Sequence, residues 1–154
     1  MRWWIGATLV LAACSSASTG GPGEVRPAGS ASSAVTEFLR AVSDSNLSKM
    51  ASLWGTTAGP ASRTKQPPDY ERRIAVMQAY LRHDDFRIAS DTPETPPTQH
   101  ALQAELRRSA CTWIVPFVAI QLADGSWIVN SVDITTAGNP SRPCQPQAGD
   151  TTGT

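Results

Sequence analysis

Three adjacent residues, His83, Asp84 and Asp85, bring an imidazole and two carboxylates together. This composition suits a general base with a group that orients it, or part of a metal site. The same residues also come directly after a stretch with helical periodicity, at the point where a polar loop would end the helix. We interpret them as that polar loop and keep the chemical role as the alternative.

The other polar residues form no recognisable catalytic motif. His100 has no Cys, His or Asp at a metal-ligand spacing, so we predict no metal site. The chain has no Gly-rich phosphate loop and no H-E-x-x-H, C-x-x-C or G-x-S-x-G sequence, and we predict no cofactor. The pairs Arg72-Arg73 and Arg107-Arg108 are interpreted as solvated faces, with sites for anionic headgroups as the alternative.

The charge balance argues against one class of partner. The chain has 13 Lys plus Arg and 13 Asp plus Glu in 154 residues, so its formal net charge is zero. Proteins that bind nucleic acid neutralise phosphates with a clustered basic surface, which this sequence lacks. We therefore expect no nucleic-acid partner, and the length is that of one domain.

The N-terminus carries the clearest chemical signal. Arg2 precedes an apolar run over residues 3–13, which is followed by Cys14. This is the pattern of an export signal. The apolar run is shorter than the roughly 20 residues that a membrane-spanning helix needs. Its last four residues, Leu11-Ala12-Ala13-Cys14, resemble the lipobox of bacterial lipoproteins.

This resemblance implies a lipid anchor on Cys14. In bacterial lipoproteins a diacylglyceryl group is attached to the cysteine sulfur, signal peptidase II cleaves before the cysteine, and the new amine is often acylated. Two or three acyl chains, palmitate among them, anchor a protein stably in a membrane. We expect a protein of the bacterial cell envelope, and Ser15 after Cys14 favours the outer membrane if the host has two membranes. The alternative is an ordinary secretory signal with a chance cysteine.

Lipidation of Cys14 would leave two cysteines, Cys111 and Cys144. An even number of cysteines in an exported protein favours a disulfide bond. The predicted hairpin described below places Cys111 opposite about Gly138, so the chain need only fold back to bring Cys144 near it. The alternative is two unpaired thiols.

Composition divides the mature chain into three parts. Residues 14–32 are the lipidated cysteine and a stretch rich in Ser, Gly and Pro, which we expect to be a flexible tether. Residues 145–154 contain no large apolar side chain and are expected to be a disordered tail. The folding unit should therefore cover residues 33–144.

The first half of this unit has the period of amphipathic helices. Three helices are predicted, at about residues 33–42, 47–54 and 69–82. Ser32 or Ser33 is expected to cap the first and Asn46 the second, and Gly55 to end the second in a left-handed conformation. The apolar positions are Val35, Phe38, Leu39 and Val42, then Leu47, Met50, Leu53 and Trp54, then Tyr70, Ile74, Met77 and Leu81.

The second half has the period of strands. Apolar residues alternate at residues 86–88 and 102–106, although the latter stretch also has helical propensity. Residues 112–134 contain two β-rich runs around Asp124-Gly125, which predicts a hairpin. Pro116 lies inside the first run and lacks an N–H, so it should occupy an edge or a bulge. Helices followed by antiparallel strands indicate an α+β fold with helices on one face of the sheet.

This order resembles the nuclear transport factor 2-like (cystatin-like) superfamily, especially its small bacterial lipoproteins. The resemblance covers residues 33–134 and rests on VTEFLRAVSDSNLSKMASLWG and DGSWIVNSVDI. It implies a curved antiparallel sheet rolled into a cone that often holds a pocket. Enzymes of the superfamily place acid/base groups inside the cone, and the candidates here are Tyr70, Tyr80, His83, Asp84, Asp85, His100, Glu105 and Asp133. None lies in a catalytic pattern, so the catalytic residues stay unknown.

The sequence leaves three functions open. The first is a membrane-anchored, non-catalytic module that binds a small apolar ligand or an envelope protein. The second is an acid/base enzyme of the isomerase, dehydratase or cyclase type, and the third is a structural subunit of an envelope complex. The tryptophans at positions 54, 113 and 127 are interpreted as core residues, with a pocket lining as the alternative.

Overall fold

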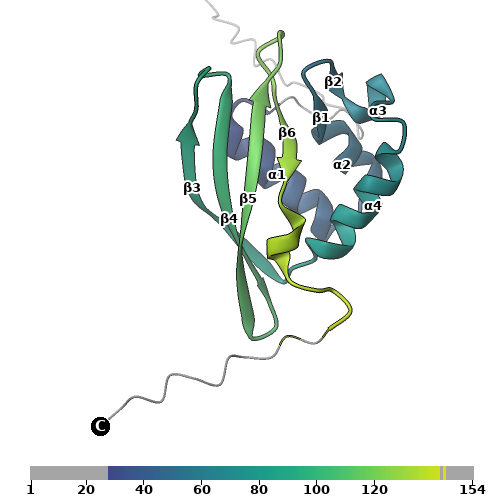
Figure 1. The fold of residues 1–154 in the computed structure, drawn as a ribbon, viewed down its shortest axis with the longest axis vertical. Helices are drawn as coiled ribbons and strands as arrows, with labels where there is room; N and C mark the ends of the chain where they lie inside the picture. Colours follow the sequence, from purple (N-terminus) through teal and green to yellow (C-terminus); the bar gives the residue numbers. More distant parts are fainter. Residues whose placement is uncertain (1–27, 143, 145–154) are drawn as a thin grey trace, which may run out of the picture.

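The computed structural model describes residues 28–142 and Cys144. The predicted signal peptide, Cys14, residues 14–27 of the predicted tether and the predicted tail lie outside the described residues. Figure 1 shows the elements. In chain order they are α1 (Ala31–Ser43), α2 (Leu47–Leu53), β1 (Gly55–Thr56), β2 (Gly59–Pro60), α3 (Ala61–Thr64), α4 (Tyr70–Tyr80), β3 (Asp85–Pro93), β4 (Gln99–Arg108), β5 (Cys111–Gln121), β6 (Trp127–Val132) and the 3-10 helix η1 (Ile134–Ala137).

The fold is α+β, as the sequence predicts. Four antiparallel strands form a sheet in the order β3-β4-β5-β6, and β1 pairs with β2 in a separate hairpin. Helix α1 lies behind this sheet in Figure 1 and contacts all four of its strands. Helix α2 packs against α1 and α4, and α4 also contacts η1. Within the described residues, no helix is long and apolar enough to cross a membrane.

The first helix begins earlier than predicted. Ser30 is the N-cap, and its side chain accepts a hydrogen bond from the Ser33 backbone N–H at 3.1 Å. The Ser33 hydroxyl in turn accepts from the Ser30 N–H at 2.9 Å, which completes a capping box. Ser32, one of the predicted caps, instead donates to Asp91 on β3. The ordered fold therefore includes residues 28–32, which the composition had assigned to the tether.

The region after α2 differs from its predicted conformation. Gly55 does not end the helix in a left-handed conformation, because it begins strand β1. A glycine is required there for another reason, since a Cβ atom would collide with the carbonyl of Gly59. The short β1–β2 hairpin and α3 lie between the second and third predicted helices, where the sequence predicted no helix or strand. Leu47 is 43% exposed and does not share the buried face of Met50 and Leu53.

The predicted β-hairpin is present as β5 and β6. Gly125 lies in its turn with φ +83°, a conformation that favours glycine. The second arm ends at Val132, two residues earlier than predicted, because η1 begins at Ile134. Residues 99–108 form a strand rather than a helix, and Leu102, Ala104 and Leu106 are buried in the core.

Pro116 lies on an inner strand, where a missing N–H would ordinarily break the ladder. Its carbonyl accepts from the Asp133 N–H at 3.0 Å, and Asp133 lies just beyond the end of β6. The backbone N and C=O of one strand residue face the same neighbour, so the nitrogen of Pro116 faces the place where β6 has ended. The sheet is locally three strands wide there, and Pro116 occupies a local edge, as predicted.

Candidate functional site

The core is closed by apolar side chains. Phe38, Leu39, Met50 and Phe117 are each at most 1% exposed, and no polar or charged residue is buried within the described part of the chain. Among the predicted acid/base candidates only Tyr70 reaches the core, and its hydroxyl bonds to Glu71 and lies 3.3 Å from Lys65 Nζ. The candidates therefore do not converge in the interior, and any reactive site must be at the surface.

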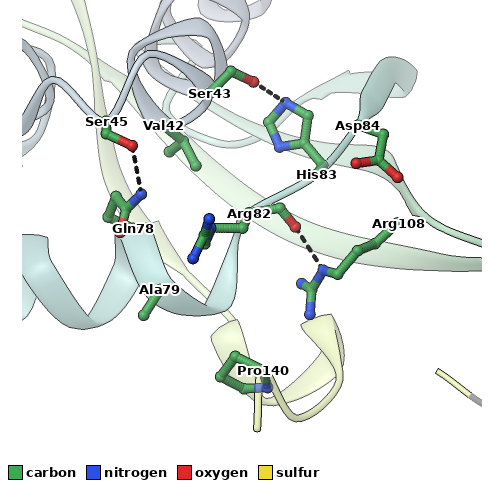
Figure 2. Close-up of a pocket in the computed structure, with 10 residues that line it drawn as sticks. All are labelled: Val42, Ser43, Ser45, Gln78, Ala79, Arg82, His83, Asp84, Arg108 and Pro140. Atoms are coloured by element: carbon green, nitrogen blue, oxygen red, sulfur yellow. Dashed lines mark hydrogen bonds between the residues drawn. The ribbon is translucent and has the colours of Figure 1, made fainter. Parts of the chain in front are cut away.

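A surface cleft of about 380 Å³ brings together one predicted cluster and residues that sequence reasoning missed. We call it the α1/α4 cleft (Figure 2) because it lies where those two helices end. Its wall contains Ser43, Gln78, Arg82, His83, Asp84 and Arg108, with Val42, Ser45, Ala79 and Pro140 completing it. The separation of 40 residues between Ser43 and His83 is why no local motif revealed the pair.

The geometry of the cleft defines the tautomer of His83. Its Nδ1 lies 2.7 Å from the carbonyl oxygen of Leu81, and its Nε2 lies 2.9 Å from Ser43 Oγ. A carbonyl can only accept a hydrogen bond, so Nδ1 carries the proton. In the neutral imidazole, Nε2 is then the acceptor and the Ser43 hydroxyl donates to it. Phe86 packs edge-on against the ring, 5.1 Å between centroids.

Arg108 joins the elements around the cleft. Its Nε donates to the carbonyl of Arg82 and its Nη2 to that of Tyr80, both at 2.8 Å. The guanidinium also lies 4.9 Å from the centre of the Trp113 ring. Burial lowers the pKa of Arg108, and the positive charge of Arg82 lowers it further. The arginine thus satisfies carbonyls that the end of α4 leaves without partners.

The tertiary structure separates the cluster at residues 83–85. The Asp84 carboxylate accepts from the Ser109 backbone N–H at 2.7 Å, on the far side from Ser43. Asp85 leaves the cleft and pairs with Arg107 across the β3–β4 ladder at 3.0 Å. His83, Asp84 and Asp85 therefore do not gather at one point, and His83 faces a serine instead.

A second polar network joins α1 to the sheet. Asp91 Oδ2 accepts from the Ser32 hydroxyl and Asp91 Oδ1 lies against His100 Nδ1, each at 2.5 Å. The pairing of β3 with β4 shifts register between Ile88 and Ser90. This β-bulge places one extra residue in β3 and so reverses the alternation of its side chains. Asp91 therefore lies on the same face of the sheet as Ile88, which is the face that the helices cover. His100 packs edge-on against Trp127, 4.8 Å between ring centroids.

Replacement of Asp91 should give a pH-dependent loss of stability. Burial raises the pKa of Asp91, but hydrogen bonds from Ser32 and His100 lower it more, and the net shift is downward. A carboxyl whose folded-state pKa is depressed stabilises the fold above its unfolded pKa, and this stabilisation is lost as the pH falls through the folded value. Asp91→Asn should lower the free energy of unfolding by about 1–2 kcal/mol at pH 7.

Urea denaturation at a series of pH values measures this effect. The difference between wild type and Asp91→Asn should shrink below about pH 4, because the carboxyl group then takes up a proton first in the unfolded chain and, at lower pH, in the folded chain. Asp124→Asn is the control, because hydrogen bonds from Ser126, two residues away, lower the pKa of Asp124. Such a local contact joins no elements, so its loss should change stability less. An unchanged difference from pH 7 to pH 3 would contradict the assignment.

A groove of about 420 Å³ lies between α4 and β6, and we call it the α4/β6 groove. Its apolar side chains are Trp54, Val76, Met77, Val132 and Ile134. Val76 is 39% exposed, which makes it one of three large apolar residues of the described chain that are exposed. The polar side chains at the groove are Asp69, Arg72, Arg73, Asn130 and Ser131.

The two arginines at this groove differ in whether they form an ion pair. Arg73 pairs with Asp69 at 3.0 Å, and the pKa of Asp69 is lowered chiefly by this hydrogen bond. Arg72 forms no ion pair with any residue that the structure describes. The Asn130 amide donates to the Gly55 carbonyl at 2.9 Å and so is already engaged. Arg72 is therefore the charged group at the groove available to a ligand.

The remaining candidates have structural surroundings. Glu105 pairs with Arg87, and Asp133 caps η1 by accepting from the Thr135 N–H. Trp54 and Trp127 belong to the buried core, as predicted, whereas Trp113 is partly buried and packs against that core. Trp54 also lines the α4/β6 groove. Among residues 28–142 and 144, no group of three or more His, Cys, Asp or Glu side chains gathers around a common point.

The structure confirms the predicted disulfide. Cys111 and Cys144 are bonded, with 5.9 Å between their Cα atoms. Gly138 lies between them along the chain, has φ +73°, and leaves no room for a Cβ, which would lie 2.6 Å from Trp113 Nε1. The chain after η1 therefore passes closely over Trp113, and its residue Pro140 forms part of the α1/α4 cleft.

Comparison with models of protein families, with curated proteins and with solved structures finds no match to this chain.

Proposed function

We propose that the protein is a lipid-anchored module of the bacterial cell envelope that binds a small amphipathic ligand in the α4/β6 groove. The ligand has an apolar body and one negatively charged group. The observation that carries this proposal is an exposed apolar groove beside an arginine without an ion-pair partner in the described chain. A closed core leaves no comparable interior site among the described residues.

The size and lining of the groove support a small ligand. Its volume of about 420 Å³ lies within the range of ligand-binding sites. The exposed side chain of Val76 and the partly buried side chains of Val132 and Ile134 offer apolar surface that a ligand would remove from water. Arg72 supplies a guanidinium that suits a carboxylate or a phosphate.

A photoreactive fatty acid tests this function. Native protein in lipid nanodiscs is illuminated with a diazirine-bearing palmitic acid, with and without an excess of plain palmitic acid. Saturable crosslinks should map by mass spectrometry to α4 and β6. Val76→Glu should abolish them, and Arg72→Gln should weaken binding about two- to fivefold, as loss of an exposed ion pair would.

Ile114→Glu is the matched control, because Ile114 is also an exposed apolar residue, at 43%, but lies on the opposite face of the sheet from the helices. This variant should crosslink like the wild type. Crosslinks that do not saturate, or that survive Val76→Glu, would contradict a ligand site in the groove. A crosslink to a copurifying protein instead would favour the envelope-partner function.

The lipid anchor at Cys14 is a separate part of the proposal. It is supported by the sequence Leu11-Ala12-Ala13-Cys14. The intact mass of the protein from its host's membranes should correspond to a chain that starts at Cys14 and carries two or three acyl groups. Cys14→Ser should release the protein from the membrane fraction or leave it uncleaved. An unmodified chain starting at Ser15 or later would refute the anchor. If the host has two membranes, we propose the outer one.

We also propose that the domain belongs to the nuclear transport factor 2-like superfamily and that its sheet forms the superfamily's cone. The support is the order of elements, with helices first and a final hairpin, and the position of α1 across all four strands. An experimental structure in which the sheet stays open and flat would contradict the cone. The acid/base function inside such a cone has no support from the described core, which contains no acid or base besides the phenol of Tyr70.

A further inference from the structure

We propose that Ser43 is a nucleophile activated by His83, and that the α1/α4 cleft hydrolyses carboxylic esters that carry a negative charge. This activity is independent of the proposed ligand site, because the α1/α4 cleft and the α4/β6 groove share no lining residue. Figure 2 shows the Ser43 hydroxyl directed at the imidazole on one wall of the cleft.

His83 has the orientation that a general base requires. An activated serine needs such a base within about 2.6–3.2 Å and a third group that orients it. His83 Nε2 is 2.9 Å from Ser43 Oγ, and the Leu81 carbonyl fixes Nδ1 as the protonated nitrogen. Nε2 therefore presents a lone pair to the serine. The carbonyl has the orienting position that a carboxylate occupies in other serine hydrolases.

Ser43 differs from the other serines in its hydrogen-bond partner. Among the described residues it is the one hydroxyl that faces an imidazole nitrogen. Ser52 and Ser126 donate to a backbone carbonyl and a carboxylate. Ser45 also lines the cleft, but its oxygen accepts a hydrogen bond from the Gln78 amide, which cannot take a proton from it. Ser45 is thus a natural internal control.

The charge of the cleft favours an anionic substrate. Arg82, Arg108 and Asp84 line the cleft, which leaves one net positive charge when His83 is neutral. Arg108 is engaged by backbone carbonyls, whereas Arg82 is exposed and pairs with no carboxylate of the described chain. Its guanidinium lies below His83 in Figure 2. This group would bind a substrate carboxylate or stabilise the oxyanion that develops on the ester carbonyl.

The reaction has two balanced steps. Ser43 Oγ bonds to the ester carbonyl carbon as its proton passes to His83 Nε2, and the carbon–oxygen bond to the alcohol then breaks. The leaving alkoxide takes the proton from His83, which leaves an acyl group on Ser43. Water then attacks this acyl group and gives a proton to His83. The acid departs, and the proton returns to Ser43.

A fluorophosphonate probe tests the nucleophile without a known substrate. The probe bonds its phosphorus to an activated serine and expels fluoride. Native full-length protein in dodecyl maltoside is treated with the probe, and the labelled serine is identified by peptide mass spectrometry. We expect labelling of Ser43 at least tenfold above Ser45. His83→Gln should reduce the labelling to the level of Ser45, while Ser45→Ala should leave it unchanged.

Ester hydrolysis tests the preference for negative charge. The native protein should hydrolyse mono(4-nitrophenyl) succinate faster than 4-nitrophenyl acetate, and Ser43→Ala should abolish both activities. Arg82→Ala should remove the preference for the negatively charged ester. Equal labelling of Ser43 and Ser45 in the wild type, or none at Ser43, would overturn the proposal. This wild-type result needs no variant to fold, and far-UV circular dichroism checks the folding of each variant.

Discussion

Replacing either cysteine of the Cys111–Cys144 bond should lower the free energy of unfolding by about 3–4 kcal/mol. The bond closes a loop with a sequence separation of 33 residues. In the loop-closure model, this constraint on the unfolded chain is worth about 3.7 kcal/mol at 25 °C. For a domain of this size, we expect the melting temperature to fall by about 15 °C.

The native contacts around the bond add to this expectation. The chain between η1 and Cys144 includes Gly138, whose backbone passes close to Trp113. The carbonyl of Ala137 also accepts from Arg108 Nη2 at 3.4 Å. Loss of the bond would free the end of this segment and weaken its contact with the tryptophan. Near-UV circular dichroism should therefore change in the tryptophan region when the bond is reduced.

The two single variants and the double variant form a matched set. Cys111→Ala and Cys144→Ala each remove the same bond, so the double variant should be no less stable than either single variant. Thermal denaturation followed by far-UV circular dichroism measures all three. Wild-type stability in a single variant would show that the bond does not support the fold. Additive losses in the double variant would show that the two side chains act separately.

Phe117→Ala should lower the free energy of unfolding by about 3–5 kcal/mol. Phe117 is 1% exposed on the helix-facing side of β5. Its ring meets that of Phe38 on α1, with 6.4 Å between centroids and an interplanar angle of 72°. The edge-on pair joins the first helix to the sheet. Since small domains have a total stability of about 5–15 kcal/mol, the loss would leave the fold marginal.

Two further variants show whether this loss comes from packing. Phe117→Leu keeps much of the volume and should be clearly less destabilising than Phe117→Ala. Ile114→Ala, on the same strand but on its exposed face, should change stability by at most about 0.5 kcal/mol. Urea denaturation gives all three values. A loss for Ile114→Ala as large as that for Phe117→Ala would contradict the assignment of the core to the helix-facing side.

Local patterns in the sequence were enough to predict most of the elements. The periodic spacing of Val35, Phe38, Leu39 and Val42 predicted α1, and all four are buried. The Asp124-Gly125 pair predicted the turn between β5 and β6. These predictions succeed because helix periodicity and turn conformation depend on residues only a few positions apart. The disulfide was also predictable, because the lipid anchor expected on Cys14 would leave Cys111 and Cys144 as a pair.

The candidate sites depend on contacts that local patterns do not contain. Ser43 and His83 are 40 positions apart and meet because the last residue of α1 and the segment that follows α4 line the same cleft. Asp91 faces Ser32 because a bulge in β3 reverses the alternation of that strand.

Residue types and their local spacing therefore predicted the three longer helices, the strands of the four-stranded sheet, the hairpin and the cysteine pair, but not β1, β2, α3 or η1. Which polar side chains meet could not be predicted in this way, because strand register and helix packing depend on the whole core. A shift of one residue in register turns a side chain to the other face of a sheet. No residue near Asp91 or Ser43 in the sequence carries that information.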